Sequence, residues 1–233
     1  METLSQKYHL SSANSINIGR LLPQCVYYVF ASVRYFRQTQ RSCNVLIPTG
    51  NMGNAFAAIM VKLMGFPIGE VHVVTNTNRV IPNYFETGVF ESRSSISTLA
   101  NAMDVGNPSN LERYIHLVSR HPSIANWVRS TSVNDDQITE AIAYAEQQWR
   151  QPVCPHTATA VHHYISQSID DVVLVATAHP YKFHDVVDEI LGRNVLVPDN
   201  LSKFLDPEPN VIDIKATIGE LASVIASLVS RTS

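Results

Sequence analysis

The fold of this chain is decided by one stretch, Asn44-Val45-Leu46-Ile47-Pro48-Thr49-Gly50-Asn51-Met52-Gly53-Asn54, which is followed by the apolar residues 55–65. The stretch predicts a short buried strand, a tight turn with two glycines and an apolar helix. Such a turn brings backbone N–H groups to a helix N-terminus, where they can hold a phosphate. Gly50 and Gly53 can adopt a positive φ and let a ligand approach the backbone closely. The turn matches neither G-x-x-x-x-G-K-[ST] nor G-x-G-x-x-G, and an ordinary strand–helix turn remains the alternative.

A second strand follows the helix and indicates a parallel sheet. Gly65-Phe66-Pro67 ends the helix, and residues 71–76 form another buried apolar run. Strand, helix and strand within about thirty residues make a right-handed βαβ unit. Residues 171–177 predict a third parallel strand. We therefore expect an α/β fold with an open, mostly parallel sheet flanked by helices.

The rest of the chain supplies helices and one long irregular segment. Apolar periodicity predicts further helices at residues 15–38, 136–149, 157–165, 182–191 and 217–230. Residues 78–110 are rich in Ser, Asn, Gly and Pro and predict a long loop. Three strands are few for a sheet that must be buried on both faces. Either strands escape this pattern or part of the sheet lies outside the chain.

Composition excludes several classes of function. The chain has 233 residues, of which 45% are hydrophobic and 16% charged, enough for one large domain or two small ones. A net charge of −3 gives no electrostatic case for nucleic acid. Cys25, Cys43 and Cys154 lie far apart, which favours reduced thiols. No apolar run is long enough to span a bilayer. We expect a soluble cytoplasmic protein that binds neither nucleic acid nor membrane.

Six short motifs occur in order along most of the chain. They are Ser12–Gln24, Pro48–Asn54, Ala102–Val105, Pro108–Arg113, Pro155–Ala158 and Thr177–Phe183. Together they resemble threonine synthase, a pyridoxal-phosphate enzyme of the tryptophan-synthase-β structural class. An ordered set of six is far more specific than any one motif. The resemblance implies that the sheet belongs to the large domain of a fold-type II pyridoxal-phosphate enzyme, and that residues 1–233 are a C-terminal portion of its catalytic domain.

The resemblance implies a lyase of threonine biosynthesis. The family converts O-phosphohomoserine and water to L-threonine and phosphate by γ-elimination and β-hydration on pyridoxal 5'-phosphate. Another fold-type II pyridoxal-phosphate lyase, such as a dehydratase, is an alternative. The motifs at residues 14–24 and 177–183 argue against it.

The resemblance also implies a set of cofactor-binding residues. They are Gly50, Asn51, Met52, Gly53, Asn54 and Thr177. The loop would hold the cofactor's phosphate by its backbone N–H groups, helped by the two asparagine amides and the helix dipole. The Thr177 hydroxyl would face the pyridine nitrogen, and the alternative is a threonine that only caps the next turn. Met52 stands where the family usually has an aromatic residue.

The implied substrate site lies at the start of the first long helix. Its candidates are Asn14, Ser15, Asn17 and Arg20, whose amides, hydroxyl and guanidinium suit a phosphate or carboxylate. Helix capping by Asn14 or Ser15 is the alternative. His156 is interpreted as a capping histidine held by packing. His162 and His163 are sequence neighbours that cannot face one another on a helix, so no metal site is expected.

The family's Schiff-base lysine has no match in this chain. In the family it lies upstream of every motif found here, so the chain resembles only about the C-terminal half of the pattern. The lysines are Lys7, Lys62, Lys182, Lys203 and Lys215, and none stands in the matching context. We expect no catalytic residue and no turnover from this chain alone, as in a truncated or split gene product. The alternative is a non-catalytic fragment that complements a separate N-terminal chain carrying the lysine.

Overall fold

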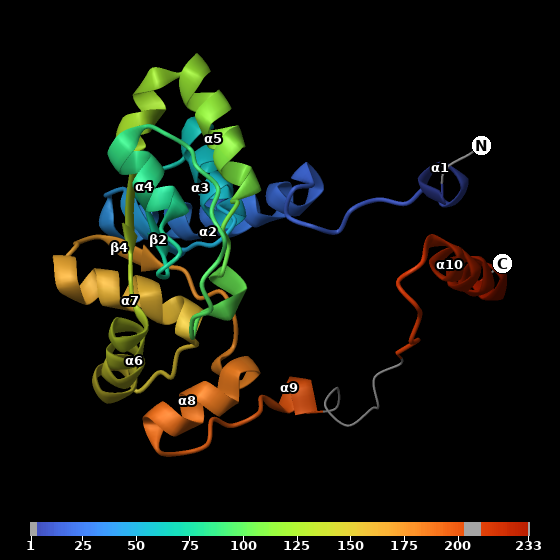
Figure 1. The fold of residues 1–233 in the computed structure, drawn as a ribbon. Coiled ribbons are helices and arrows are strands. Elements are labelled where there is room, and N and C mark those ends of the chain that lie inside the picture. Colours follow the sequence, from blue (N-terminus) through green and yellow to red (C-terminus); the bar gives the residue numbers. More distant parts are fainter. Residues whose placement is uncertain (1–3, 203–210, 233) are drawn as a thin grey trace. The chain divides into compact units, whose positions relative to one another are not determined.

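The computed structural model describes residues 4–202 and 211–232, which fall into two units (Figure 1). The larger unit is Ala13–Leu196, and the other comprises Met1–Ser12 and Val197–Ser233. The described helices of the second unit are α1 (Leu4–Tyr8), α9 (Asp199–Ser202) and α10 (Ile218–Thr232). The helix expected at 217–230 is therefore confirmed as α10. Lys203 lies outside the described residues.

The larger unit is built on a parallel sheet of four strands in the order β3-β2-β1-β4. The strands are β1 (Cys43–Pro48), β2 (Ile68–Thr75), β3 (Val128–Ser132) and β4 (Val172–Leu174). The parallel α/β sheet is confirmed. The strand missed by the sequence pattern is β3, an edge strand of mostly polar residues that gives no apolar run. The last strand is shorter than expected, so Thr177 lies beyond its end.

Helices surround the sheet in the order that the sequence predicts, with two additions. They are α2 (Ile18–Thr39), α3 (Gly53–Leu63), α4 (Val80–Thr87), α5 (Ser109–Arg120), α6 (Asp135–Tyr144), α7 (Pro155–Gln167) and α8 (His184–Leu191). Short 3-10 or π turns are η1 (Asn101–Met103), η2 (Pro122–Trp127), η3 (Ala145–Trp149) and η4 (Pro180–Phe183).

The expectation of a long loop at residues 78–110 is confirmed only in part, since residues 88–100 form no helix or strand. That segment contains α4 and η1, and it reaches the start of α5. Its polar composition hides α4, whose Val80 and Ile81 are buried against the sheet. Tertiary packing therefore outweighs the turn-rich composition.

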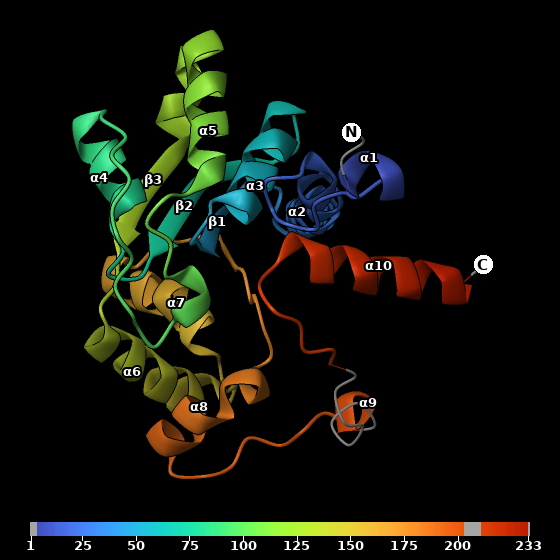
Figure 2. The same ribbon diagram turned by 45° about the vertical axis from the view of Figure 1, so that its right-hand side comes forward.

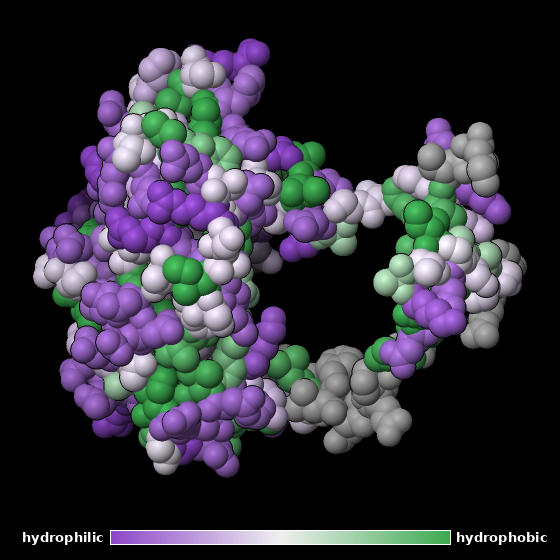
Figure 3. Space-filling view, in the orientation of Figure 1, coloured by the Kyte–Doolittle hydropathy of each residue, from purple (hydrophilic) through white to green (hydrophobic). Residues whose placement is uncertain are grey.

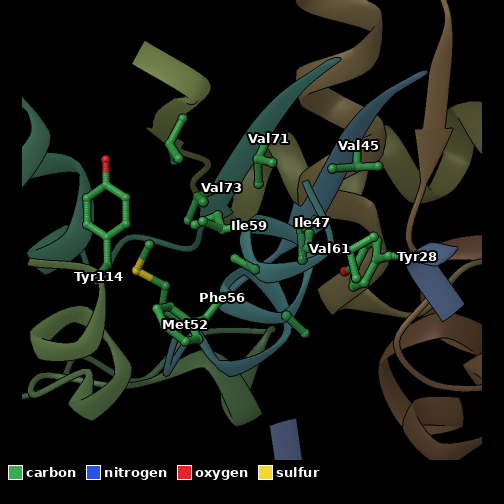
Figure 4. Close-up of a cluster of buried hydrophobic side chains, with 14 of the residues drawn as sticks. Tyr28, Val45, Ile47, Met52, Phe56, Ile59, Val61, Val71, Val73 and Tyr114 are labelled. Atoms are coloured by element: carbon green, nitrogen blue, oxygen red, sulfur yellow. The ribbon is translucent and has the colours of Figure 1, made fainter. Parts of the chain in front are cut away.

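Both faces of the sheet are covered. Figures 1 and 2 show α2 and α3 on one face, and α7 with α6 beyond it on the other. The strand β1 is buried along almost its whole length because it lies inside the sheet between these layers. In Figure 4, Ile47 of β1, Ile59 of α3 and Val73 of β2 lie in one cluster of buried side chains. This packing fixes the turn between β1 and α3.

The surface of the larger unit carries both hydrophilic and hydrophobic side chains. Most of the face in Figure 3 is hydrophilic, and hydrophobic side chains gather over α6 and α8. In residues 4–202 and 211–232, no helix is both long and apolar enough to cross a membrane.

Candidate functional site

A cavity of about 350 Å³ lies at the carboxyl end of β1, where the chain turns into α3. Ligands of open α/β sheets bind at this end of the strands. Its walls come from five of the six motifs, in full or in part. The lining residues are Ser15, Arg20, Gln24, Pro48, Thr49, Gly50, Asn51, Met52, Gly53, Asn54, Ala102, Met103, His156, Thr177, Ala178, Lys182 and Phe183.

The turn between β1 and α3 lines this cavity with Gly50 to Asn54 and carries a row of backbone N–H groups. In the described part of the chain, the N–H groups from Gly50 to Ala55 have no hydrogen-bond acceptor. The row is bounded by Thr49, which donates to Val74 O at 2.8 Å, and Phe56, which donates to Met52 O at 2.9 Å. Unpaired N–H groups at a helix N-terminus attract anions through their own dipoles and the helix dipole. The turn therefore fits a phosphate.

The two glycines of the turn, Gly50 and Gly53, were expected to adopt a positive φ, but they are needed for close packing instead. Neither is among the residues with positive φ; Met52 takes that conformation, with φ 60° and ψ 8°. A Cβ on Gly50 would lie 2.8 Å from Met103 Cα, and one on Gly53 would lie 3.0 Å from Leu21 Cδ2. The glycines are thus required by close packing of η1 and α2 against the turn. Met52, 1% exposed, is held in its left-handed conformation by burial.

The side chain of Asn51 braces the turn. Its Nδ2 donates to Ser15 Oγ at 2.6 Å, and its Oδ1 accepts from Ser109 N at 2.6 Å and from Ser109 Oγ at 3.0 Å. The Asn54 Oδ1 accepts from the Tyr28 hydroxyl. Both amides are therefore engaged by the protein, and the backbone is the part of this turn left for a ligand.

The charged residues of the cavity are all cationic. Arg20 and Lys182 line it, and no aspartate or glutamate is among the lining residues. Arg20 Nη1 donates to Ala13 O, which fixes the guanidinium near the start of α2. Two cations and a helix N-terminus without a carboxylate make the cavity attractive to a ligand with more than one negative group.

His156 belongs to the cavity wall, which the sequence interpretation did not anticipate. It stands in the first turn of α7, and its Nε2 accepts from Ala102 N at 3.0 Å. Its Nδ1 is buried and has no partner among the described residues. Burial, with a smaller contribution from nearby Lys182, lowers the pKa of His156 to about 4. The Pro-His-Thr motif pointed to this residue, but a single sequence does not show which face of α7 meets the cavity.

Eight of the ten site residues predicted from the sequence line the cavity, and two do not. Asn17 caps α2, with its Oδ1 accepting from Gly19 N at 2.9 Å. Asn14 Oδ1 accepts from Ile16 N at 3.3 Å. The cap of α2 is therefore Asn17 and neither Asn14 nor Ser15. The Thr177 backbone N–H donates to Thr157 Oγ1 at 3.3 Å.

A histidine pair lies away from the cavity. His72 Nδ1 on β2 is 3.0 Å from His163 Nε2 on α7. Burial lowers the pKa of both rings, that of His163 to about 4. Among the described residues, no group of three or more His, Cys, Asp or Glu side chains is placed to hold a metal ion.

Comparisons with known proteins point to one family. Residues 153–225 match a family model described as "Threonine synthase, C-terminal". The chain is 35% identical over 202 residues to a threonine synthase of Haemophilus influenzae, covering 86% of this chain and 47% of that protein. It is 32% identical over 207 residues to a threonine synthase of Escherichia coli, covering 88% of this chain and 48% of that protein.

The superposition on a solved structure also covers nearly all of this chain and about half of the other. The crystal structure of threonine synthase from Escherichia coli superposes with a TM-score of 0.85 and 29% identity, covering 97% of this chain and 53% of that one. The chain thus spans about half the length of the relatives it matches.

Proposed function

This chain belongs to the threonine synthase family, of whose members it corresponds to a C-terminal portion, and on that premise we propose that its cavity binds pyridoxal 5'-phosphate. The proposed cofactor-binding residues are Gly50 to Asn54 and Thr177. The observation that carries the proposal is the row of N–H groups from Gly50 to Asn54, which lines the cavity and finds no acceptor among the described residues, so that a phosphate would supply the acceptors.

The chain's other residues would orient the cofactor. When bound, pyridoxal phosphate supplies an electron-accepting ring that stabilises negative charge on carbon. Thr177 lines the same cavity and offers a neutral hydroxyl to the ring nitrogen. Met52 supports the turn, because its side chain is buried in the core.

A second anion fits the cationic part of the cavity. Arg20 and Ser15 line the wall at the start of α2, and we propose that they bind the phosphate or carboxylate of O-phosphohomoserine. Asn14 and Asn17 would act indirectly, by holding the turn that carries Ser15 and the start of α2. Arg20 suits this role because a guanidinium can bind two oxygens of one anion at once.

We propose that the whole protein converts O-phosphohomoserine and water to L-threonine and phosphate, as a carbon–oxygen lyase. The lysines that the structure describes include no match to the family's Schiff-base lysine, so this chain alone should bind the cofactor without turnover. The test measures binding of pyridoxal phosphate by calorimetry and phosphate release from O-phosphohomoserine in the same preparation. Binding without release supports the proposal, whereas failure to bind contradicts it and release contradicts the lysine assignment.

A second candidate function is complementation of a separate N-terminal chain. It is favoured by the apolar outer face of α2, where Val26 and Phe30 are both 64% exposed and Tyr27 is 71% exposed. In the described part of the chain, β4 pairs with β1 alone, so its other edge is open. Large apolar patches and open strand edges mark association surfaces.

The complementation test uses co-expression with the N-terminal half of the Escherichia coli relative. A Val26→Glu, Phe30→Glu variant should lose co-purification, because it places charges in the apolar face without touching the core. Arg120→Glu, at the end of α5, is the matched control and should co-purify. No co-purification of the wild type contradicts the complementation proposal.

A cytoplasmic location is also proposed, supported by the three free, buried cysteines.

A further inference from the structure

Lys182 is a cationic residue of the cavity wall to which the proposed function gives no role. It stands in η4, at the end of the sixth motif, and lines the same cavity as the turn at Gly50. The residue is exposed, so a ligand can reach its ammonium group. In residues 4–202 and 211–232, that ammonium group makes no hydrogen bond and no ion pair. Its charge is therefore available to a ligand.

Two observations place the Lys182 ammonium group beside the wall of the cavity. Its Nζ lies over the ring of Phe183, 5.6 Å from the ring centroid. That ring packs against His156, with 4.5 Å between the ring centroids, and both residues line the cavity. Burial, and after it the charge of Lys182, lowers the pKa of His156 to about 4. The positive charge of Lys182 thus lies close to this wall, and His156 itself stays neutral at physiological pH.

The cavity contains no negative group that would balance this charge. Among the described residues that line it, there is no aspartate and no glutamate. The side-chain oxygens of Gln24 and Thr177 can accept hydrogen bonds, but they are neutral. The other cation, Arg20, belongs to α2 and donates to Ala13 O. Two cations on separate segments of one cavity favour a ligand that carries two anionic groups.

The two cations suit different anionic groups. A guanidinium presents a planar fork that matches the two oxygens of a carboxylate, whereas a lysine ammonium acts as a point charge and binds phosphate well. O-phosphohomoserine carries one carboxylate and one phosphate. The phosphate of the cofactor would find its donors in the N–H groups of the turn, and so does not need Lys182.

We propose that Lys182 is a substrate-binding residue that binds the phosphate of O-phosphohomoserine and leaves the carboxylate to Arg20. The inference rests on the proposed function and adds to it a residue and an assignment of the two anions. Lys182 would also determine specificity, because L-homoserine has no group for it to bind.

Lys182→Gln removes the charge and keeps a polar side chain. It should weaken binding of O-phosphohomoserine about tenfold and change that of L-homoserine by less than about twofold. Its urea midpoint should equal that of the wild type, since Lys182 is exposed. Lys182→Arg keeps the charge and should retain affinity within about threefold. Lys7→Gln is the matched control, because Lys7 Nζ also lies over the next ring in sequence, 5.2 Å from the Tyr8 centroid, but Lys7 does not line the cavity.

Calorimetric titration of the cofactor-free chain with O-phosphohomoserine and with L-homoserine measures these affinities. A third titration uses pyridoxine 5'-phosphate, which carries the cofactor's phosphate but lacks the aldehyde that reacts with lysine amines. Weaker binding of O-phosphohomoserine alone by Lys182→Gln, with Lys182→Arg and Lys7→Gln close to the wild type, supports the inference.

The inference is overturned if the wild type does not bind O-phosphohomoserine, or if Lys182→Gln binds it as tightly as the wild type does. An equal loss with L-homoserine also overturns it, as does a loss confined to pyridoxine 5'-phosphate, which would assign Lys182 to the cofactor. Failure of the wild type to bind pyridoxine 5'-phosphate contradicts the proposed cofactor site instead. The titrations with O-phosphohomoserine need no cofactor and still decide the role of Lys182 in that case.

Discussion

Replacing Gly50 with alanine tests the packing that shapes the turn. A Cβ there would lie 2.8 Å from Met103 Cα, 3.1 Å from Val105 Cγ2 and 3.4 Å from Ala102 O. The first contact is with backbone, so a side-chain rotation cannot relieve it, and η1 or the turn must move. Overpacking of this kind costs about 1–3 kcal/mol.

The expected result is a loss of both stability and affinity. With a urea slope of about 2 kcal/mol per M, a loss of about 2 kcal/mol lowers the unfolding midpoint by about 1 M. Affinity for pyridoxal phosphate should fall as well, because the N–H groups that follow Gly50 are displaced. Chemical denaturation followed by circular dichroism, and calorimetric titration, measure the two effects.

Gly219→Ala is the matched control. Apart from its chain neighbours and its own helix backbone, no atom of the residues that the structure describes lies within 4 Å of the Cβ position at Gly219, and its φ is not in the positive range. This variant should keep the wild-type midpoint or gain up to about 1 kcal/mol from helix propensity. A Gly50→Ala protein with wild-type midpoint and affinity would refute the close-packing account of the turn.

Three further predictions concern residues around and beyond the cavity. The folded-state pKa of His163, about 4, lies below the usual value of 6.5, so stability should fall as pH drops from about 6.5 to about 4. The urea midpoint of His163→Leu should change less with pH over that range than the wild-type midpoint does. An equal change in the two proteins contradicts the lowered pKa of His163. Asn51→Ala removes bonds to two serines and should cost about 1–3 kcal/mol in the same assay, with an unchanged midpoint as the contrary result. Asp104 accepts from Asn76 Nδ2 at 2.7 Å and from Thr98 N at 3.1 Å, so Asp104→Asn should destabilise by about 1.5–3 kcal/mol, and a neutral effect would show that the amide replaces the carboxylate.

The central strands and their turn were predictable because their signals are local. The apolar run at Val45 to Pro48, the glycines after it and the apolar helix all lie within twenty residues, and burial on both faces of the sheet makes the pattern continuous. The edge strand Val128–Ser132 escaped because its side chains are only partly covered. Its place in the sheet comes from pairing with β2, which a local pattern does not contain.

The sequence predicted only the part of the site whose binding groups lie within one short segment. The turn at Gly50 to Asn54 carries its own anion-binding groups, so it could be identified from spacing and from the accompanying motifs. The place of His156 in the cavity wall depends on a bond to Ala102, 54 positions earlier in the chain. Such contacts arise from tertiary packing. The positive φ at Met52 is likewise imposed by the core and not by the residue type.

Titration of the ¹⁵N-labelled chain with pyridoxal 5'-phosphate, followed by amide resonances, shows directly whether the turn binds the phosphate. We expect the N–H resonances from Gly50 to Ala55 to shift in a saturable manner, and pyridoxal without its phosphate to leave them unmoved. Binding of the phosphate at the turn is ruled out if these amides do not respond, or if pyridoxal phosphate shifts only resonances away from the turn.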